Sequence, residues 1–280
     1  MALTERNGVS IAEICVYTPA LAIAIWLCVR HGFGRSSGWL YLIIFSLARL
    51  IGASMQLATI SQPQNISLYI GSFTLENVGL SPLILVELGL LSRALTSIRK
   101  SVTTFVNERM LRAIQILVLV GLILGSVGGS NAGSNYAVTG VYTASSISQA
   151  GLGLMIAGYI LTVLAAVQVA VQISHAEPGE RRLSLAVGLS LPFVLVRLGY
   201  AAESTFGHNS RFNQFTGDVN IQLGMSVIME MIAIVIIEGF GLTLKKIPKG
   251  QQLTATEDAR KVSSQNQYEM GPHYETNAGH

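Results

Sequence analysis

The stretch QAGLGLMIAGYILTVLAAVQVAVQI, residues Gln149–Ile173, decides the fold because it carries no charged side chain over its whole length. It is longer than the roughly 20 mostly apolar residues that a helix needs to cross the hydrocarbon core of a bilayer. Six other stretches are similarly long and apolar. The sequence therefore predicts an all-α, polytopic membrane protein built as a bundle of seven transmembrane helices. The predicted spans are Val9–Arg30, Gly38–Ile60, Tyr69–Leu91, Met110–Gly129, Gln149–Ile173, Leu183–Phe206 and Gly217–Leu242.

The composition agrees with a membrane domain followed by a polar tail. Half of the residues are hydrophobic and 12% are charged, which is about half the charged fraction of an ordinary soluble domain. After the last span the chain becomes rich in Gln, Asn and Ser, a composition typical of disorder. We expect a seven-span transmembrane domain over residues 1–247 and a disordered, cytoplasmic polar tail over residues 248–280.

The lysines and arginines fall in alternate loops. If the N-terminus is outside, fourteen of the 18 basic residues lie on the cytoplasmic side, Arg6 and Arg211 lie outside, and Arg49 and Arg197 lie within spans. Cytoplasmic loops of membrane proteins carry an excess of Lys and Arg. This placement predicts an N-out, C-in orientation, and it explains the net charge of +3 without nucleic-acid binding.

Several ionisable residues lie inside the predicted spans, where a charge costs at least a few kcal/mol and therefore faces the bundle interior and finds a partner. Arg49, Arg197 and Glu230 are placed near mid-membrane by their positions along spans two, six and seven. Helical spacing extends these residues into polar stripes, which four of the seven spans direct toward a common interior. The candidate cavity residues are Arg49, Gln56, Glu76, Glu87, Arg197, Glu203, Gln222, Glu230 and Glu238.

Two interpretations of this interior remain open. In the first, the charges form structural ion pairs that fix helix register. In the second, they surround a polar cavity that binds a ligand, a substrate or a proton. The buried carboxylates outnumber the two arginines, which favours the second interpretation.

The spans lack the residues of familiar intramembrane catalysis. They contain no lysine for a retinal Schiff base and no histidine for a zinc hydrolase. Aspartate occurs at Asp218 and Asp258, so paired intramembrane aspartates are absent as well. The sequence therefore predicts a protein that is not an enzyme, with no catalytic residues, metal or cofactor.

Three features lie between or within spans. Asn65-Ile66-Ser67 is a candidate N-glycosylation site in the predicted outer loop. The uncharged segment 131–148 is interpreted as a flexible loop or an extracellular lid. Pro19, Pro82 and Pro192 are each expected to kink a span.

Three motifs carry a family resemblance. They are YTP at 17–19, RHGFGR at 30–35 followed by Gly38-Trp39, and F-x-x-x-R-x-x-G at 45–52. With them the chain resembles an uncharacterised fungal family of seven-span membrane proteins over roughly residues 1–247. In plan it is more distantly similar to fungal lipid-translocating exporter and resistance proteins and to heptahelical receptors. The resemblance implies the fold and a fungal source, and it implies no activity.

Three functions follow as hypotheses. A carrier would bind or move a small amphipathic molecule through the polar interior. A receptor-like sensor would use the basic 92–112 loop and the tail to engage a cytosolic partner. A structural membrane protein would use its charges only to hold the bundle. In each case membrane lipids surround the spans, in the plasma membrane or an endomembrane.

Overall fold

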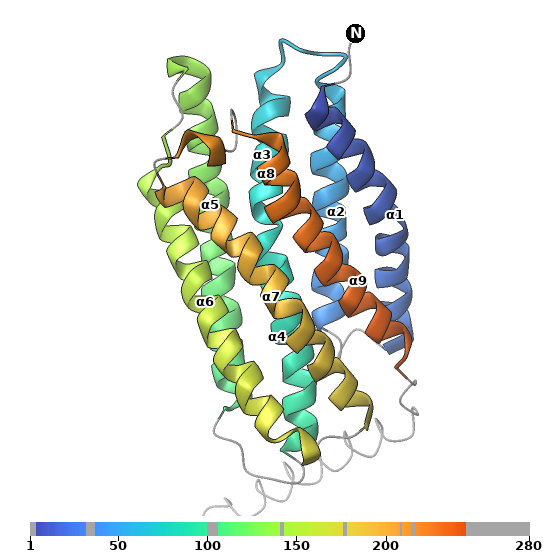
Figure 1. Cartoon of the computed structure of the whole chain (residues 1–280). Coiled ribbons are helices and arrows are strands. Elements are labelled where there is room, and N and C mark those ends of the chain that lie inside the picture. Colours follow the sequence, from blue (N-terminus) through green and yellow to red (C-terminus); the bar gives the residue numbers. More distant parts are fainter. Residues whose placement is uncertain are drawn as a thin grey trace, which may run out of the picture. The chain divides into compact units, whose positions relative to one another are not determined.

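The structure is a computed structural model that describes residues 4–31, 37–99, 106–140, 143–175, 178–207, 209–213 and 217–244. All of the regular structure in these residues is helical (Figure 1), and seven helices are long and apolar enough to cross a membrane. The seven-helix prediction is therefore confirmed. The helices are α1 (Glu5–His31), α2 (Ser37–Ala58), α3 (Ile66–Val78), α4 (Leu80–Ile98), α5 (Glu108–Thr139), α6 (Ser146–Val171), α7 (Pro178–Phe206), α8 (Val219–Gln222) and α9 (Ile228–Leu242), with short 3₁₀ turns η1 (Ile173–His175) and η2 (Ser210–Phe212).

The third span, Ile66–Ile98, consists of α3 and α4, which are separated at Gly79. Pro82 has no N–H, so the carbonyl of Val78, four residues earlier, loses the hydrogen bond that a continuous helix would give it. A kink was expected at three prolines, and the structure interrupts the helix near this one. By contrast, α1 and α7 run through Pro19 and Pro192 as single helices.

The seventh span is interrupted as well. It has three parts, because a π-helix, η3 (Leu223–Val227), lies between α8 and α9. A π-helix takes in extra residues per turn and is found mostly as a bulge within an α-helix, frequently at functional sites. The sequence predicts a single span here and does not reveal the bulge.

The fourth span is longer than expected, so the interpretation of residues 131–148 as a loop is wrong over most of its length. α5 continues to Thr139, and α6 begins at Ser146. α5 approaches the start of α6 closely at Gly128, just before this segment, where the Ser145 hydroxyl donates a hydrogen bond to the Gly128 carbonyl at 3.1 Å. The helix ends at Gly140, whose φ of +69° is a left-handed conformation that favours glycine.

Glycine also sets the distance between α5 and α6 where Gly121 and Gly125 face Gly151. A Cβ added to Gly151 would lie 2.5 Å from the backbone nitrogen of Gly125, and one added to Gly121 would lie 3.0 Å from the carbonyl oxygen of Gly151. Small residues of this kind let transmembrane helices approach with backbone in contact. The glycines therefore serve packing within the bundle.

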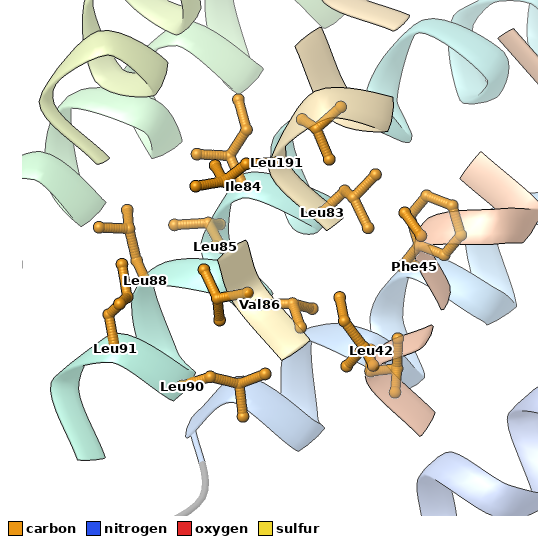
Figure 2. Packing of buried hydrophobic residues seen from close by; sticks show 14 of the residues in the cluster. Leu42, Phe45, Leu83, Ile84, Leu85, Val86, Leu88, Leu90, Leu91 and Leu191 are labelled. Carbon is orange, nitrogen blue, oxygen red and sulfur yellow. The ribbon is translucent and has the colours of Figure 1, made fainter. Parts of the chain in front are cut away.

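α4 occupies the centre of the bundle. It packs against α2, α5, α6 and α7, and every residue from Leu80 to Leu91 is buried. Figure 2 shows leucine, isoleucine and valine side chains of α4 meeting Leu42 and Phe45 of α2 and Leu191 of α7. The outward faces of the other helices carry exposed apolar side chains such as Ile123, Leu164 and Val235. An apolar exterior around buried charges is the arrangement that a bilayer requires.

We call the end of the bundle at which α1 and α3 begin and α2, α5 and α7 end the upper end, as it is drawn in Figure 1. The opposite end, where α4 and α9 finish, is the lower end.

Candidate functional site

Two arginines and a glutamate from three helices form the centre of the polar interior. Arg197 of α7 places its Nε 2.7 Å from Oε1 of Glu230 on α9, and Arg49 of α2 forms an ion pair with the other oxygen, Oε2. The Glu230 side chain is fully buried, and those of both arginines nearly so. One carboxylate therefore bridges two guanidinium groups in an environment of low polarity.

Glu13 of α1 joins this centre, although it is not among the candidate cavity residues that the sequence predicts. Its Oε1 lies 3.6 Å from Nη1 of Arg49, at a position where the Glu13 side chain is 10% exposed. One turn further along α1, the Tyr17 ring packs edge-on against Phe45 with centroids 5.6 Å apart. The Tyr17 hydroxyl is buried and has no hydrogen-bond partner among the described residues. α1 thus contributes to the polar interior, in addition to the four spans that the sequence predicts to form it.

Glu76 and Gln222 extend the centre toward the upper end. The backbone carbonyl of Glu76 accepts a hydrogen bond from Nη2 of Arg197 at 3.1 Å, and its side chain accepts one from the Gln222 amide. Glu76 is on α3 and Gln222 is the last residue of α8, directly before the π-helix. These contacts tie the third span to the sixth and seventh. We call Glu13, Arg49, Glu76, Arg197, Gln222 and Glu230 the central network.

The interruption of the third span makes room for this network. A Cβ added to Gly79 would lie 2.7 Å from Nη2 and 2.9 Å from Nε of Arg49. The backbone dihedral angles of Gly79 are those of a right-handed helix, so space rather than conformation requires glycine there. The Arg49 guanidinium therefore packs directly on the backbone between α3 and α4.

A cavity adjoins the central network on the side of the upper end. It contains about 510 Å³ of atom-free space, part of which opens to the surroundings. Its walls come from α1, α2, α3 and the beginning of the seventh span. The polar side chains that line it are Arg6, Ser10, Glu13, Arg49, Gln56, Ser72, Glu76 and Gln222. We call it the polar cavity.

A second, mostly apolar cavity lies beside the first and contains about 740 Å³ of atom-free space, part of which opens to the surroundings. α3 contributes Tyr69 and Ile70 to its wall, and the part of α5 that lies beyond its predicted end contributes Tyr136. Arg6, Gln56 and Phe73 line both cavities, and the Arg6 guanidinium carbon lies 5.4 Å from the centroid of the Phe73 ring. We call this space the apolar cavity.

The lower half of the bundle holds two buried carboxylates that lack an arginine. Glu87 of α4 is fully buried, and Ser190 of α7 lies within hydrogen-bond distance of it at 2.8 Å. Glu238 of α9 is 5% exposed, and its Oε1 has no hydrogen-bond partner among the described residues. Closer to the lower end, Arg93 of α4 pairs with Glu180 of α7 at 2.9 Å.

The structure therefore separates the nine candidate residues into groups. Arg49, Glu76, Arg197, Gln222 and Glu230 belong to the central network. Gln56 lines both cavities. Glu87 and Glu238 lie apart in the lower half, and the half-buried Glu203 side chain forms no ion pair or hydrogen bond among the described residues.

Two further polar residues, Asn65 and Asp218, lie outside the spans at the upper end. The exposed Asn65 precedes α3, and its amide donates to the Gln62 side chain at 3.0 Å. Asp218 precedes α8, accepts a hydrogen bond from the Asn220 backbone N–H at 3.0 Å and pairs with Arg211 at 3.2 Å. The Asn220 N–H and the Arg211 guanidinium lower the pKa of Asp218 below its ordinary value. No three His, Cys, Asp or Glu side chains in the described part of the chain are close enough to share a metal ion.

Fold and site together define a multi-pass membrane protein in which seven apolar helices enclose a buried charge network and two adjoining cavities. The chain belongs to the family described as a domain of unknown function (DUF7702), whose model matches residues 3–247. Comparisons with curated proteins and with solved structures gave no match.

Proposed function

We propose that the protein binds a small amphipathic molecule within the bundle and carries it across the membrane without chemical change. One observation carries this proposal: the polar cavity adjoins a larger apolar cavity, and the two share Arg6, Gln56 and Phe73. Ligand sites typically combine a mainly apolar wall with a few convergent polar groups. The two cavities divide these properties between them.

The ligand would lie across the boundary between the cavities. Its polar group would meet Glu13 and Glu76, which are held near the arginines of the central network. Its apolar part would contact Tyr69 and Tyr136 of the apolar cavity. This division favours an amphipathic ligand over a fully polar solute, because a fully polar solute would leave the apolar wall without a matching partner.

The charge distribution of the loops supports a direction for this site. With the N-terminus outside, both cavities open toward the external or luminal side, and the basic segment 92–112 and the tail face the cytosol. Movement of the ligand would then require the lower half of the bundle to open in turn. A cytosolic partner bound at the 92–112 segment or the tail would sense or control that opening.

A ligand-induced thermal shift tests the proposal. Purified protein in lipid nanodiscs is mixed with an alkyl amine, an alkyl carboxylate and an alkyl alcohol of equal chain length. A ligand at 100 times its dissociation constant adds about 2.7 kcal/mol to the free energy of unfolding, which is a readily measured change. We expect at least one of the three compounds to raise the unfolding temperature.

Two variants of α2 show whether the cavities bind the compound. Gln56→Phe fills the boundary between the cavities, whereas Ser54→Phe places the same side chain on the exposed face of the same helix. The shift should persist in Ser54→Phe and disappear in Gln56→Phe, with Gln56→Leu as a smaller replacement should the phenylalanine impair folding. Equal shifts in all variants, or no shift with any compound, would contradict the proposal and favour a structural role.

A further inference from the structure

Glu87 has an unusual set of hydrogen-bond partners for a buried carboxyl group. The Ser190 Oγ atom lies 2.8 Å from Glu87 Oε1 and 2.9 Å from the carbonyl oxygen of Val187. A hydroxyl has one proton to donate and two lone pairs with which to accept. Were Glu87 ionised, both neighbours of Ser190 would be acceptors, and one of these two short contacts would have no proton between its oxygens.

A proton on Glu87 resolves this conflict. The Glu87 carboxyl then donates to Ser190 Oγ, and the Ser190 hydroxyl donates to the Val187 carbonyl. Each short contact contains one proton, and the carboxyl group is neutral. The hydrogen-bond count alone thus favours the protonated acid.

The surroundings of Glu87 favour the same state. The elements packed on α4 are α2, α3, α5, α6, α7 and the 3₁₀ turn η1, and among their described side chains no arginine, lysine, histidine or second carboxylate pairs with Glu87. Ser190 of α7 and Tyr159 of α6 are the polar groups that face it, and the Tyr159 hydroxyl donates to the Leu191 carbonyl at 2.8 Å. A buried carboxylate without a cation is strongly disfavoured and takes up a proton instead.

We propose that Glu87 is a proton-binding site of the bundle, loaded in this conformation and unloaded when the α4–α7 interface opens toward the lower end. The Arg93–Glu180 pair, at 2.9 Å, lies between the same two helices nearer that end and holds the interface closed. When water reaches Glu87, its O–H bond breaks and the proton passes to water. The Ser190 hydroxyl then turns from the Val187 carbonyl to the new carboxylate.

Infrared spectroscopy of the full chain in nanodiscs tests the loaded state, since a protonated carboxyl has a carbonyl stretch distinct from that of a carboxylate. At pH 7 the wild type should show this band, and Glu87→Gln should lack one component of it. Glutamine copies the shape and the donor of the neutral acid, so this variant should fold. Glu238→Gln is the matched control, and it should leave the Glu87 component in place.

Ser190→Ala provides a second measurement that does not alter Glu87. Loss of the Ser190 acceptor should shift the Glu87 component to higher frequency, because a carboxyl that no longer donates a hydrogen bond has a stiffer carbonyl. An unchanged spectrum in Ser190→Ala, or a Glu87→Gln spectrum identical to that of the wild type, would overturn the proposal.

Deuterium exchange tests the route of the proton. Arg93→Ala should speed the exchange of the Glu87 component in D₂O several-fold, and Arg211→Ala, at the upper end, should leave the rate unchanged. Equal rates in the wild type and Arg93→Ala would refute the proposed opening at the lower end.

Coupling of this proton to ligand movement rests on the proposed function. The infrared result does not, so a bundle that binds no amphiphile would still show a protonated Glu87.

Discussion

Glu230 and Glu238 lie two turns apart on α9, and both are buried, yet the protein surrounds them in opposite ways. Glu230, in the upper half, bridges Arg49 and Arg197. Glu238, in the lower half, forms no ion pair among the described residues. The comparison extends to the two halves of the bundle, because Glu87 of the lower half has Ser190 as its hydrogen-bonding partner, again without a cation.

The difference shows that burial of a carboxyl group does not by itself define its role. A carboxylate between two guanidinium groups keeps its charge and fixes the positions of three helices. A carboxyl group without a cation is most stable as a neutral acid, and it responds to pH and to the entry of water. The central network therefore holds fixed charge, whereas Glu87 of the lower half holds an exchangeable proton.

The largest expected effect comes from removing an arginine of the upper half. Arg49→Ala or Arg197→Ala leaves buried carboxylate charge without its partner, which typically costs about 3–5 kcal/mol. The measurement is the free energy of unfolding in detergent micelles, with exposed Arg211→Ala as the control. If both buried-arginine variants are as stable as the control, the upper half does not depend on paired charge.

The same substitution on one helix compares the two halves directly. Glu230→Gln leaves Arg49 with Glu13 and Arg197 without a carboxylate partner, and it should destabilise the bundle by about 3 kcal/mol. Glu238→Gln replaces an acid without a charged partner and should change the stability by no more than about 1 kcal/mol. Equal losses in the two variants would remove the distinction between the halves.

A smaller effect is expected where Arg49 packs on the backbone. In Gly79→Ala the new Cβ would overlap the Arg49 guanidinium, and overpacking of this kind typically costs about 1–3 kcal/mol. Gly199→Ala is the matched control, because a Cβ there meets no atom within 4 Å and alanine favours a helix. A Gly79→Ala protein as stable as Gly199→Ala would show that the guanidinium has room to move.

The smallest effect concerns Asp218, outside the spans. Its pKa is lowered in the folded protein, so its stabilising contribution is present above the ordinary value of 3.8 and is lost as the pH falls through the folded value. Wild type should unfold at a slightly higher temperature than Asp218→Asn at pH 7, and the difference should shrink below about pH 4. A difference that grows on acidification would contradict the sign of the shift.

The number of spans and the burial of Arg49 and Arg197 could be predicted from the sequence, because the length of each apolar stretch and the charges within it can be read directly from the residues. It was insufficient for Glu13, since that residue lies near the upper end of its span, where a charge reaches the interface at little cost. A signal was present nonetheless: the buried residues Ser10, Glu13, Tyr17 and Ala20 follow a spacing of three and four, typical of one helical face.

The end of α5 shows a different limit of the sequence. Its glycines and serines resemble a loop when they are considered locally, yet the helix continues through them to Thr139, with Ala132 and Gly133 buried. Tertiary packing of this kind overrides local propensity. The wall that Tyr136 adds to the apolar cavity was therefore beyond sequence reasoning, as was the assignment of Glu87 and Glu238 to a separate half.

The π-helix η3 sets the rotational phase of the last span. Gln222 and Glu230 are eight residues apart, and at about 100° per residue a regular α-helix would point them about 80° away from each other. One extra residue in the bulge makes eight residues turn nearly as seven do, which reduces this angle to about 20° and directs both side chains inward. Deleting one residue within 223–227 should turn the π-helix into regular α-helix, in which the two side chains, now seven positions apart, keep this angle of about 20°. A bulge placed before Gln222 would instead leave eight regular helical residues between the two side chains and turn Gln222 away from Glu230 by about 80°, so the position of the bulge determines whether Gln222 faces Glu76.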